Sequence, residues 1–125
     1  MGSEMCIRDR GSIMVEIERL APNTWKNFLD APAVLLVLGK EDCKPCTAWT
    51  QTLTIDQNQS VAAHEIRIGY IPLDAPGFTQ FKIDHPWVSL VDVLPFNALF
   101  INGERGAEWA GGSIERLIKE LKGRV

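Results

Sequence analysis

The order of apolar and polar residues along the chain predicts alternating strands and helices. An unbroken apolar run, Ala33–Leu38, is typical of a strand buried on both faces, as inside a parallel sheet. Partial alternation of apolar and polar residues predicts half-exposed strands over Ile13–Leu20 and Ile66–Leu73. Another strand is predicted over Phe96–Ile101, and these four segments can supply most of one sheet.

The end of the chain carries turn and cap signals that fix the order of its last elements. Asn102-Gly103 is the strongest hairpin signal in the sequence and joins the preceding strand to a partner over Arg105–Trp109. A bend at Gly111-Gly112 follows, and Ser113 is placed to cap a final helix. That helix has four apolar residues at helical spacing: Ile114, Leu117, Ile118 and Leu121.

Three helical segments are predicted earlier in the chain. Asn23 or Thr24 can cap a short helix that ends before Pro32 and carries three apolar residues on one face: Trp25, Phe28 and Leu29. A helix that begins at about Cys43 runs through Trp49 and Leu53, which are expected in the core, and breaks near Asn58. Residues 78–91 are helical in part, with an interruption at Pro86.

Composition narrows the class of protein. The chain has 125 residues, which suits one domain, and it is 46% hydrophobic and 23% charged, as in ordinary globular proteins. Its longest apolar stretch is too short to span a bilayer, so no membrane association is expected. A net charge of −3 without long charged runs argues against a nucleic-acid partner.

The first residues are expected to lie outside the domain. Glu4–Arg10 resembles a translated sequencing adapter and lacks the apolar stretch of a signal peptide. We therefore expect residues 1–12 to be a non-native or disordered leader and residues 13–125 to form the domain. Cys6, the third of 3 cysteines, is excluded with the leader, and the remaining pair suits a reducing compartment.

The remaining two cysteines form Cys43-Lys44-Pro45-Cys46, directly after the buried strand and at the start of a helix. A helix N-terminus favours thiolate, because its unpaired N–H groups and partial positive charge stabilise an anion. Cys43, at the helix start beside Lys44, is the predicted nucleophile, although Asp42 opposes its ionisation. Cys46, one turn on, is the predicted resolving thiol, and the pair can close a disulfide. Pro45 sets the first helical turn.

The order of elements, this motif and Leu94-Pro95 before the strand Phe96–Ile101 together resemble the thioredoxin family. The resemblance covers roughly residues 13–125 and implies an α/β, thioredoxin-like fold, a central mixed β-sheet flanked by helices. It also implies that Pro95 follows a cis peptide bond beside the cysteines. The backbone N–H and carbonyl of Leu94 would then pair with a bound peptide by strand addition.

The chain also departs from the family pattern. Val37 stands where thioredoxins usually carry a buried Asp that helps to move the proton of the resolving cysteine, so the task would fall to water or Glu41. Asp42 stands where Trp is usual, Lys44 replaces Gly, and Phe96 replaces a common Thr. The segment Asp84-His85-Pro86-Trp87 is additional, and we interpret it as an exposed loop with one buried Trp rather than a substrate surface.

The resemblance implies a thiol–disulfide oxidoreductase that reduces or exchanges protein disulfides through a mixed disulfide, in a reducing cytoplasm. It needs no cofactor besides the Cys43–Cys46 pair, but it needs disulfide-containing substrates and a separate reductase or dithiol donor, and it is expected to be a monomer. Two alternatives remain: a binding module with vestigial thiols, and a metal-binding scaffold. For the latter, His64 and His85 lack ligand spacing, so a dimer would have to share ligands, and no metal site is predicted.

Overall fold

The computed structural model describes residues 17–56 and 66–122, which form one five-stranded sheet with helices on both faces. The strands are β1 (Ile17–Arg19), β2 (Ala33–Gly39), β3 (Arg67–Pro72), β4 (Phe96–Ile101) and β5 (Glu104–Ala110). The helices are α2 (Trp25–Leu29), α3 (Lys44–Asp56), α4 (Thr79–Asp84), the 3-10 helix η3 (Pro86–Leu90) and α5 (Ile114–Lys122).

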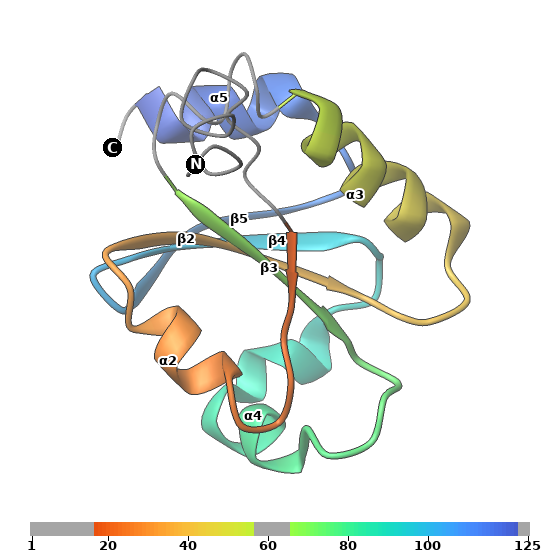
Figure 1. Ribbon diagram of the computed structural model, residues 1–125, viewed down its shortest axis with the longest axis vertical. Coiled ribbons are helices and arrows are strands. Elements are labelled where there is room, and N and C mark those ends of the chain that lie inside the picture. The colour runs from red at the N-terminus through yellow and green to blue at the C-terminus, as the bar shows by residue number, and fades with distance from the viewer. Residues whose placement is uncertain (1–16, 57–65, 123–125) are drawn as a thin grey trace, which may run out of the picture.

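The sheet is mixed, with the strand order β1-β3-β2-β4-β5. β3 is parallel to both of its neighbours, β1 and β2, whereas β4 is antiparallel to β2 and β5. Figure 1 shows α3 and α5 on one face of the sheet and α2 and α4 on the other. The predicted α/β architecture with a central mixed sheet is therefore confirmed.

β2 is the centre of the core. Its residues Val34 to Leu38 are fully buried, and successive side chains enter two different apolar clusters. Val34, Leu36 and Leu38 belong to the cluster beneath α2 and α4, while Leu35 and Val37 belong to the cluster beneath α3 and α5. The unbroken apolar run follows from this burial, because both faces of the strand are covered by helices.

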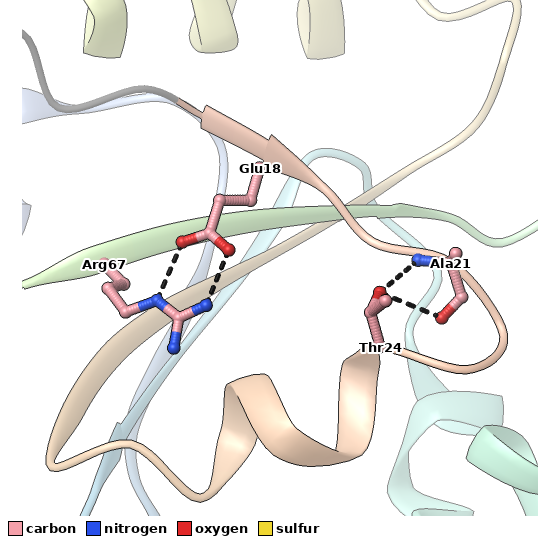
Figure 2. Close-up of polar contacts among 4 residues, drawn as sticks. All are labelled: Glu18, Ala21, Thr24 and Arg67. Carbon is pink, nitrogen blue, oxygen red and sulfur yellow. Dashed lines mark hydrogen bonds and ion pairs between the residues drawn. The ribbon is translucent and has the colours of Figure 1, made fainter.

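Two of the predicted turn and cap signals have the expected geometry, and one does not. Asn102 and Gly103 both have positive φ, and the Ser113 hydroxyl accepts a hydrogen bond from the Arg116 N–H at 3.1 Å. Thr24, however, does not cap α2 through its side chain. Its hydroxyl bonds back to Ala21, accepting from the N–H at 2.7 Å and donating to the carbonyl at 3.3 Å (Figure 2). That turn leads the chain from β1 into α2.

β1 is short and is tied to β3 by side chains as well as by backbone. The Arg67 guanidinium donates two hydrogen bonds to the Glu18 carboxylate, at 2.7 and 2.8 Å (Figure 2). Of the strand predicted over residues 13–20, residues 13–16 lie outside the described residues, and the structure has the strand over Ile17–Arg19. The predicted leader and the predicted helix break near Asn58 lie outside them.

Candidate active site

The cysteine motif lies at the carboxyl end of β2, where a short loop after Gly39 leads into α3. α3 begins at Lys44, so Cys43 occupies the position just before the helix and Pro45 lies in the first turn. Proline is tolerated there because the first N–H groups of a helix have no intrahelical acceptor. The buried strand thus fixes one end of the loop and the helix fixes the other, which places Cys43 at the positive end of α3.

Cys43 and Cys46 form a disulfide, with their Cα atoms 5.2 Å apart. The backbone N–H of Cys46 also donates a hydrogen bond to the sulfur of Cys43, at 3.2 Å. The Cys43 sulfur therefore has the role that a side-chain oxygen usually has at the start of a helix. In the reduced protein the same N–H group and the helix terminus favour a thiolate at Cys43.

The two sulfurs differ in access. Cys43 is 9% exposed, whereas Cys46 is 1% exposed and lies against the sheet. This difference agrees with the expected order, in which Cys43 is the cysteine that an incoming disulfide can reach. Burial disfavours an isolated thiolate at Cys46, because an anion loses its hydration there.

A groove of about 560 Å³ opens beside Cys43. It brings together three residues expected at the site, Cys43, Lys44 and Pro45, with Leu94 from the loop before β4. Its other lining residues are charged: Lys40, Asp42 and Asp92. With the two lysines balancing the two aspartates, the groove has no strong preference for a substrate of either charge.

The Leu94–Pro95 peptide bond is cis, as the sequence predicts. Pro95 is buried, and its carbonyl accepts a hydrogen bond from the Gly111 N–H at 2.7 Å. Leu94 is half-buried and faces the groove beside Cys43. Two segments far apart in the sequence therefore meet at one end of the inner strands β2 and β4, and together they can hold an extended peptide next to the Cys43 sulfur.

A second cavity, of about 530 Å³, lies on the Cys46 side of the motif. Charged and phenolic side chains line it together with Cys46, namely Arg19, Lys40, Glu41 and Tyr70. Arg19 and Glu41 form an ion pair across its mouth. Glu41 is among the residues that the sequence singled out, whereas Tyr70 is not; Tyr70 is half-buried in β3, a strand whose other residues after Arg67 are buried.

Val37 is fully buried in the cluster beneath α3, among apolar side chains. Strand β2 therefore offers no carboxylate beneath Cys46, and Val37 can neither accept nor donate a proton. The register places Tyr70 of β3 directly beside Val37. Burial, with a further contribution from the charge of Glu41, raises the pKa of Tyr70, so its hydroxyl keeps its proton.

The segment Asp84–Trp87 differs from the expected exposed loop with one buried Trp, because it joins the end of α4 to the start of η3 and its Trp is only half-buried. The ring centre of His85 lies 5.1 to 6.2 Å from the ring centres of four other aromatic side chains, and the Arg105 guanidinium lies 4.4 Å from the ring centre of Trp87.

Within residues 17–56 and 66–122, no three His, Cys, Asp or Glu side chains gather where they could hold a metal ion. His64, the other histidine considered for a metal, lies outside these ranges. In the same ranges, no helix is both long and apolar enough to cross a membrane.

No protein-family model matches the chain, and neither does any curated protein. Solved structures do match, at low sequence identity. Thioredoxin f from spinach chloroplast, in its long form, is 13% identical with a TM-score of 0.70, over 93% of this chain and 92% of that one. Thioredoxin O2 from Arabidopsis thaliana, oxidised, is 14% identical with a TM-score of 0.67, over 89% and 95%. Mitochondrial thioredoxin 3 from Saccharomyces cerevisiae, oxidised, is 17% identical with a TM-score of 0.65, over 86% and 94%.

These matches span almost the full length of both partners, so the likeness concerns the whole domain rather than one motif. The sheet order, the disulfide at the start of α3 and the cis bond before β4 agree with it. The chain has the thioredoxin fold, with a cysteine pair at the end of its central strand.

Proposed function

We propose that the protein is a thiol–disulfide oxidoreductase that reduces or exchanges disulfides in other proteins. The observation that carries the proposal is the hydrogen bond from the Cys46 N–H to the Cys43 sulfur at the start of α3. This contact provides a stabilised thiolate in the reduced protein, next to a second cysteine that can complete a disulfide.

In the proposed reaction, the Cys43 thiolate attacks one sulfur of the substrate disulfide. A bond forms between Cys43 and that sulfur, and the other substrate sulfur leaves as a thiolate that takes a proton from water. Cys46 then loses its proton and attacks Cys43, and the second substrate sulfur leaves in the same way. Two electrons pass from the cysteine pair to the substrate, and Cys43–Cys46 remains as the disulfide.

Leu94 is the proposed docking point for the substrate backbone. In the described part of the chain, no hydrogen bond engages the N–H or the carbonyl of Leu94, although the residue lines the groove beside Cys43. An extended substrate segment can therefore pair with Leu94 as an added strand. Lys44 and Pro45, both exposed at the rim, would contact the same segment.

The proposed cycle requires two kinds of partner. One is a protein that carries an accessible disulfide, and the other is a separate reductase or dithiol donor that resets the Cys43–Cys46 pair. We also propose that the protein acts as a monomer in the reducing cytoplasm, because such a compartment keeps a cysteine pair in the dithiol form between turnovers.

Reduction of insulin by dithiothreitol, with the protein as catalyst, tests this function. The wild type should accelerate the reaction, and Cys43→Ser should abolish the acceleration. Cys46→Ser should instead accumulate mixed disulfides through Cys43, because the resolving step is missing. A wild type without activity, whose Cys46→Ser variant traps no partner, would favour a binding module with vestigial thiols.

Selective alkylation tests the assignment of the two cysteines. A short iodoacetamide pulse on the reduced protein at neutral pH should label Cys43 before Cys46, because Cys43 is the more exposed residue and its sulfur lies at the helix terminus. Mass spectrometry of the digested protein locates the label. Preferential labelling of Cys46 would reverse the two roles.

A further inference from the structure

Gly39, the last residue of β2, leaves room for a close approach between α3 and β3. A side chain at this position would collide with the hydroxyl and ring edge of Tyr70, and with the sulfur of Cys46 at 2.9 Å. The phenol and the sulfur therefore both lie close to the same point, the place that a side chain of Gly39 would occupy. Tyr70 also lines the same cavity as Cys46.

The hydroxyl of Tyr70 is free to change its partner. It donates a hydrogen bond to the Lys40 carbonyl at 3.1 Å while the cysteines are joined in a disulfide. A disulfide sulfur is a weak acceptor, so a neutral carbonyl is the better partner in this state. A thiolate carries a full charge and forms a hydrogen bond about twice as strong as a neutral one. An O–H rotor can then turn from the carbonyl to the sulfur.

The charges around Tyr70 keep it in the protonated form that such a role requires. Burial contributes most to its raised pKa; Glu41 and Asp74 add to it, and Arg19 opposes it. A phenol ordinarily ionises near pH 10 and a thiol near 8.5. Tyr70 therefore still carries its proton at the pH where an ordinary thiol ionises.

We propose that Tyr70 is a further catalytic residue of this site, whose hydroxyl donates a hydrogen bond to the Cys46 thiolate during the resolving step. This role rests on the proposed function and deepens it. The thiol proton of Cys46 leaves to water in the cavity that Tyr70 and Glu41 line. The freed electron pair forms the bond to Cys43, the bond from Cys43 to the substrate sulfur breaks, and that sulfur takes a proton from water.

Tyr70 thus compensates for the apolar residue at Val37. The two residues are paired across β2 and β3, so the phenol approaches the resolving cysteine from the neighbouring strand. A carboxylate at this place would accept the proton of Cys46, whereas a phenol stabilises the anion after the proton has left. The chemistry at Cys46 therefore depends on a hydrogen-bond donor.

The first experiment isolates Cys46 in a variant that carries both Cys6→Ser and Cys43→Ser, and it measures the thiol pKa of Cys46 from the pH dependence of alkylation. Adding Tyr70→Phe removes only the hydroxyl and should raise that pKa by about one unit, which lowers the thiolate fraction at neutral pH about tenfold. Thr50→Val is the matched control. It removes a hydroxyl that lines the same cavity but donates to the Thr47 carbonyl, and it should leave the pKa unchanged.

A kinetic experiment follows the resolving step in the Cys6→Ser variant, which keeps both cysteines of the motif and has no third thiol. With a symmetric aromatic disulfide as the substrate, the first coloured thiolate reports attack by Cys43 and the second reports attack by Cys46. Tyr70→Phe should leave the first release unchanged and slow the second about threefold, because the tenfold lower thiolate fraction is partly offset by the greater nucleophilicity of a more basic thiolate. Equal slowing of both releases, or no slowing of either, would overturn the proposal.

A third measurement needs no substitution of the tyrosine. The chain contains one Tyr, so incorporation of fluorotyrosine labels position 70 alone. In the Cys43→Ser variant, its fluorine NMR resonance should shift with the same midpoint as the ionisation of Cys46. This pH-dependent shift should vanish when Cys46→Ser is added, and a resonance that does not respond to the ionisation of Cys46 would refute the contact.

The outcomes separate this inference from the proposed function. The pKa and NMR measurements use no substrate, so they detect a hydrogen bond between Tyr70 and the Cys46 thiolate even in a protein that fails to reduce insulin. Conversely, an active protein whose Cys46 pKa does not respond to Tyr70→Phe refutes the role of Tyr70 and leaves the oxidoreductase intact.

Discussion

Asn97 is the single buried polar residue in the core of the described part of the chain, and it links three segments. Its side-chain oxygen accepts a hydrogen bond from the Trp49 indole at 2.7 Å. Its amide nitrogen donates to the carbonyls of Trp109 at 3.2 Å and Gly111 at 2.8 Å. Through these bonds one side chain of β4 fixes α3, and with it the cysteine motif, over the sheet and over the bend after β5.

Replacing Asn97 with Ala should lower the free energy of unfolding by about 2–4 kcal/mol, because the Trp49 N–H and the Trp109 carbonyl lose a partner in a buried place and the half-buried Gly111 carbonyl loses one too. Urea unfolding followed by Trp fluorescence measures the change. Asn27→Ala, at an exposed position of α2, is the control and should change stability by less than about 0.5 kcal/mol. Equal effects of the two substitutions would contradict the role of Asn97.

The roles of some single residues could be predicted from the sequence, and those of others could not. Cys43 and Cys46 could be predicted because their spacing and their place after an apolar run carry the chemistry, and Leu94-Pro95 could be predicted through the family resemblance. Asn97 and Tyr70 could not. Each lies in a strand pattern where nothing marks one polar atom as buried, and their partners come from elements far away in the chain.

The β4–β5 hairpin is an element whose turn was specified by two residues. Asn102 and Gly103 have φ of 53° and 84°, the left-handed conformation that a two-residue hairpin turn requires at both positions. A side chain added at Gly103 would meet no atom within 4 Å. Any cost of substitution there is therefore conformational rather than steric.

Gly103→Ala should consequently destabilise the protein by about 1–2 kcal/mol, the cost of holding an L residue in the left-handed region. Gly103→Asn should cost less, because Asn adopts this conformation more readily than Ala does. Thermal or urea unfolding of the two variants gives the comparison. The opposite order, with Asn the more damaging residue, would show that the turn is limited by something other than φ.

Elements could be predicted wherever periodicity or a local signal was strong. The amphipathic spacing of α5 and its Ser113 cap are local, and so is the interruption by Pro86 that separates α4 from η3. The cap expected from Thr24 failed because its hydroxyl has a competing partner nearby, the backbone of Ala21. A side chain of this type can satisfy a turn as readily as a helix start.

At the scale of the whole molecule, strand order decides what surrounds the disulfide. Placing β3 between β1 and β2 brings Arg19 and Tyr70 to the Cys46 side, while β4 brings Leu94 to the Cys43 side. Two cavities of different chemistry therefore flank one cysteine pair. The order of a mixed sheet does not follow from apolar spacing, which is why the family resemblance was needed to anticipate it.

His85 joins elements of the face opposite α3 and α5. Its ring contacts rings from α2, α4 and β4, namely those of Trp25, Phe81 and Phe100. Burial lowers the pKa of His85; Arg105 adds to this effect, and the charge of Asp84 opposes it. The neutral ring is thus the form that the folded protein favours.

This preference makes stability depend on pH in a definite direction. Below about pH 6.5 the histidine of the unfolded chain takes up a proton that the folded protein resists, so folding weakens as the pH falls toward the lowered pKa of His85. Above that pH both states hold a neutral ring and the contribution is constant. Urea unfolding between about pH 7.5 and 5.5 should therefore show a smaller loss of stability in His85→Phe than in the wild type. His64 is present in both proteins, so the difference between the two slopes isolates His85. Parallel slopes would show that the ring of His85 is protonated as easily in the folded state as in the unfolded one.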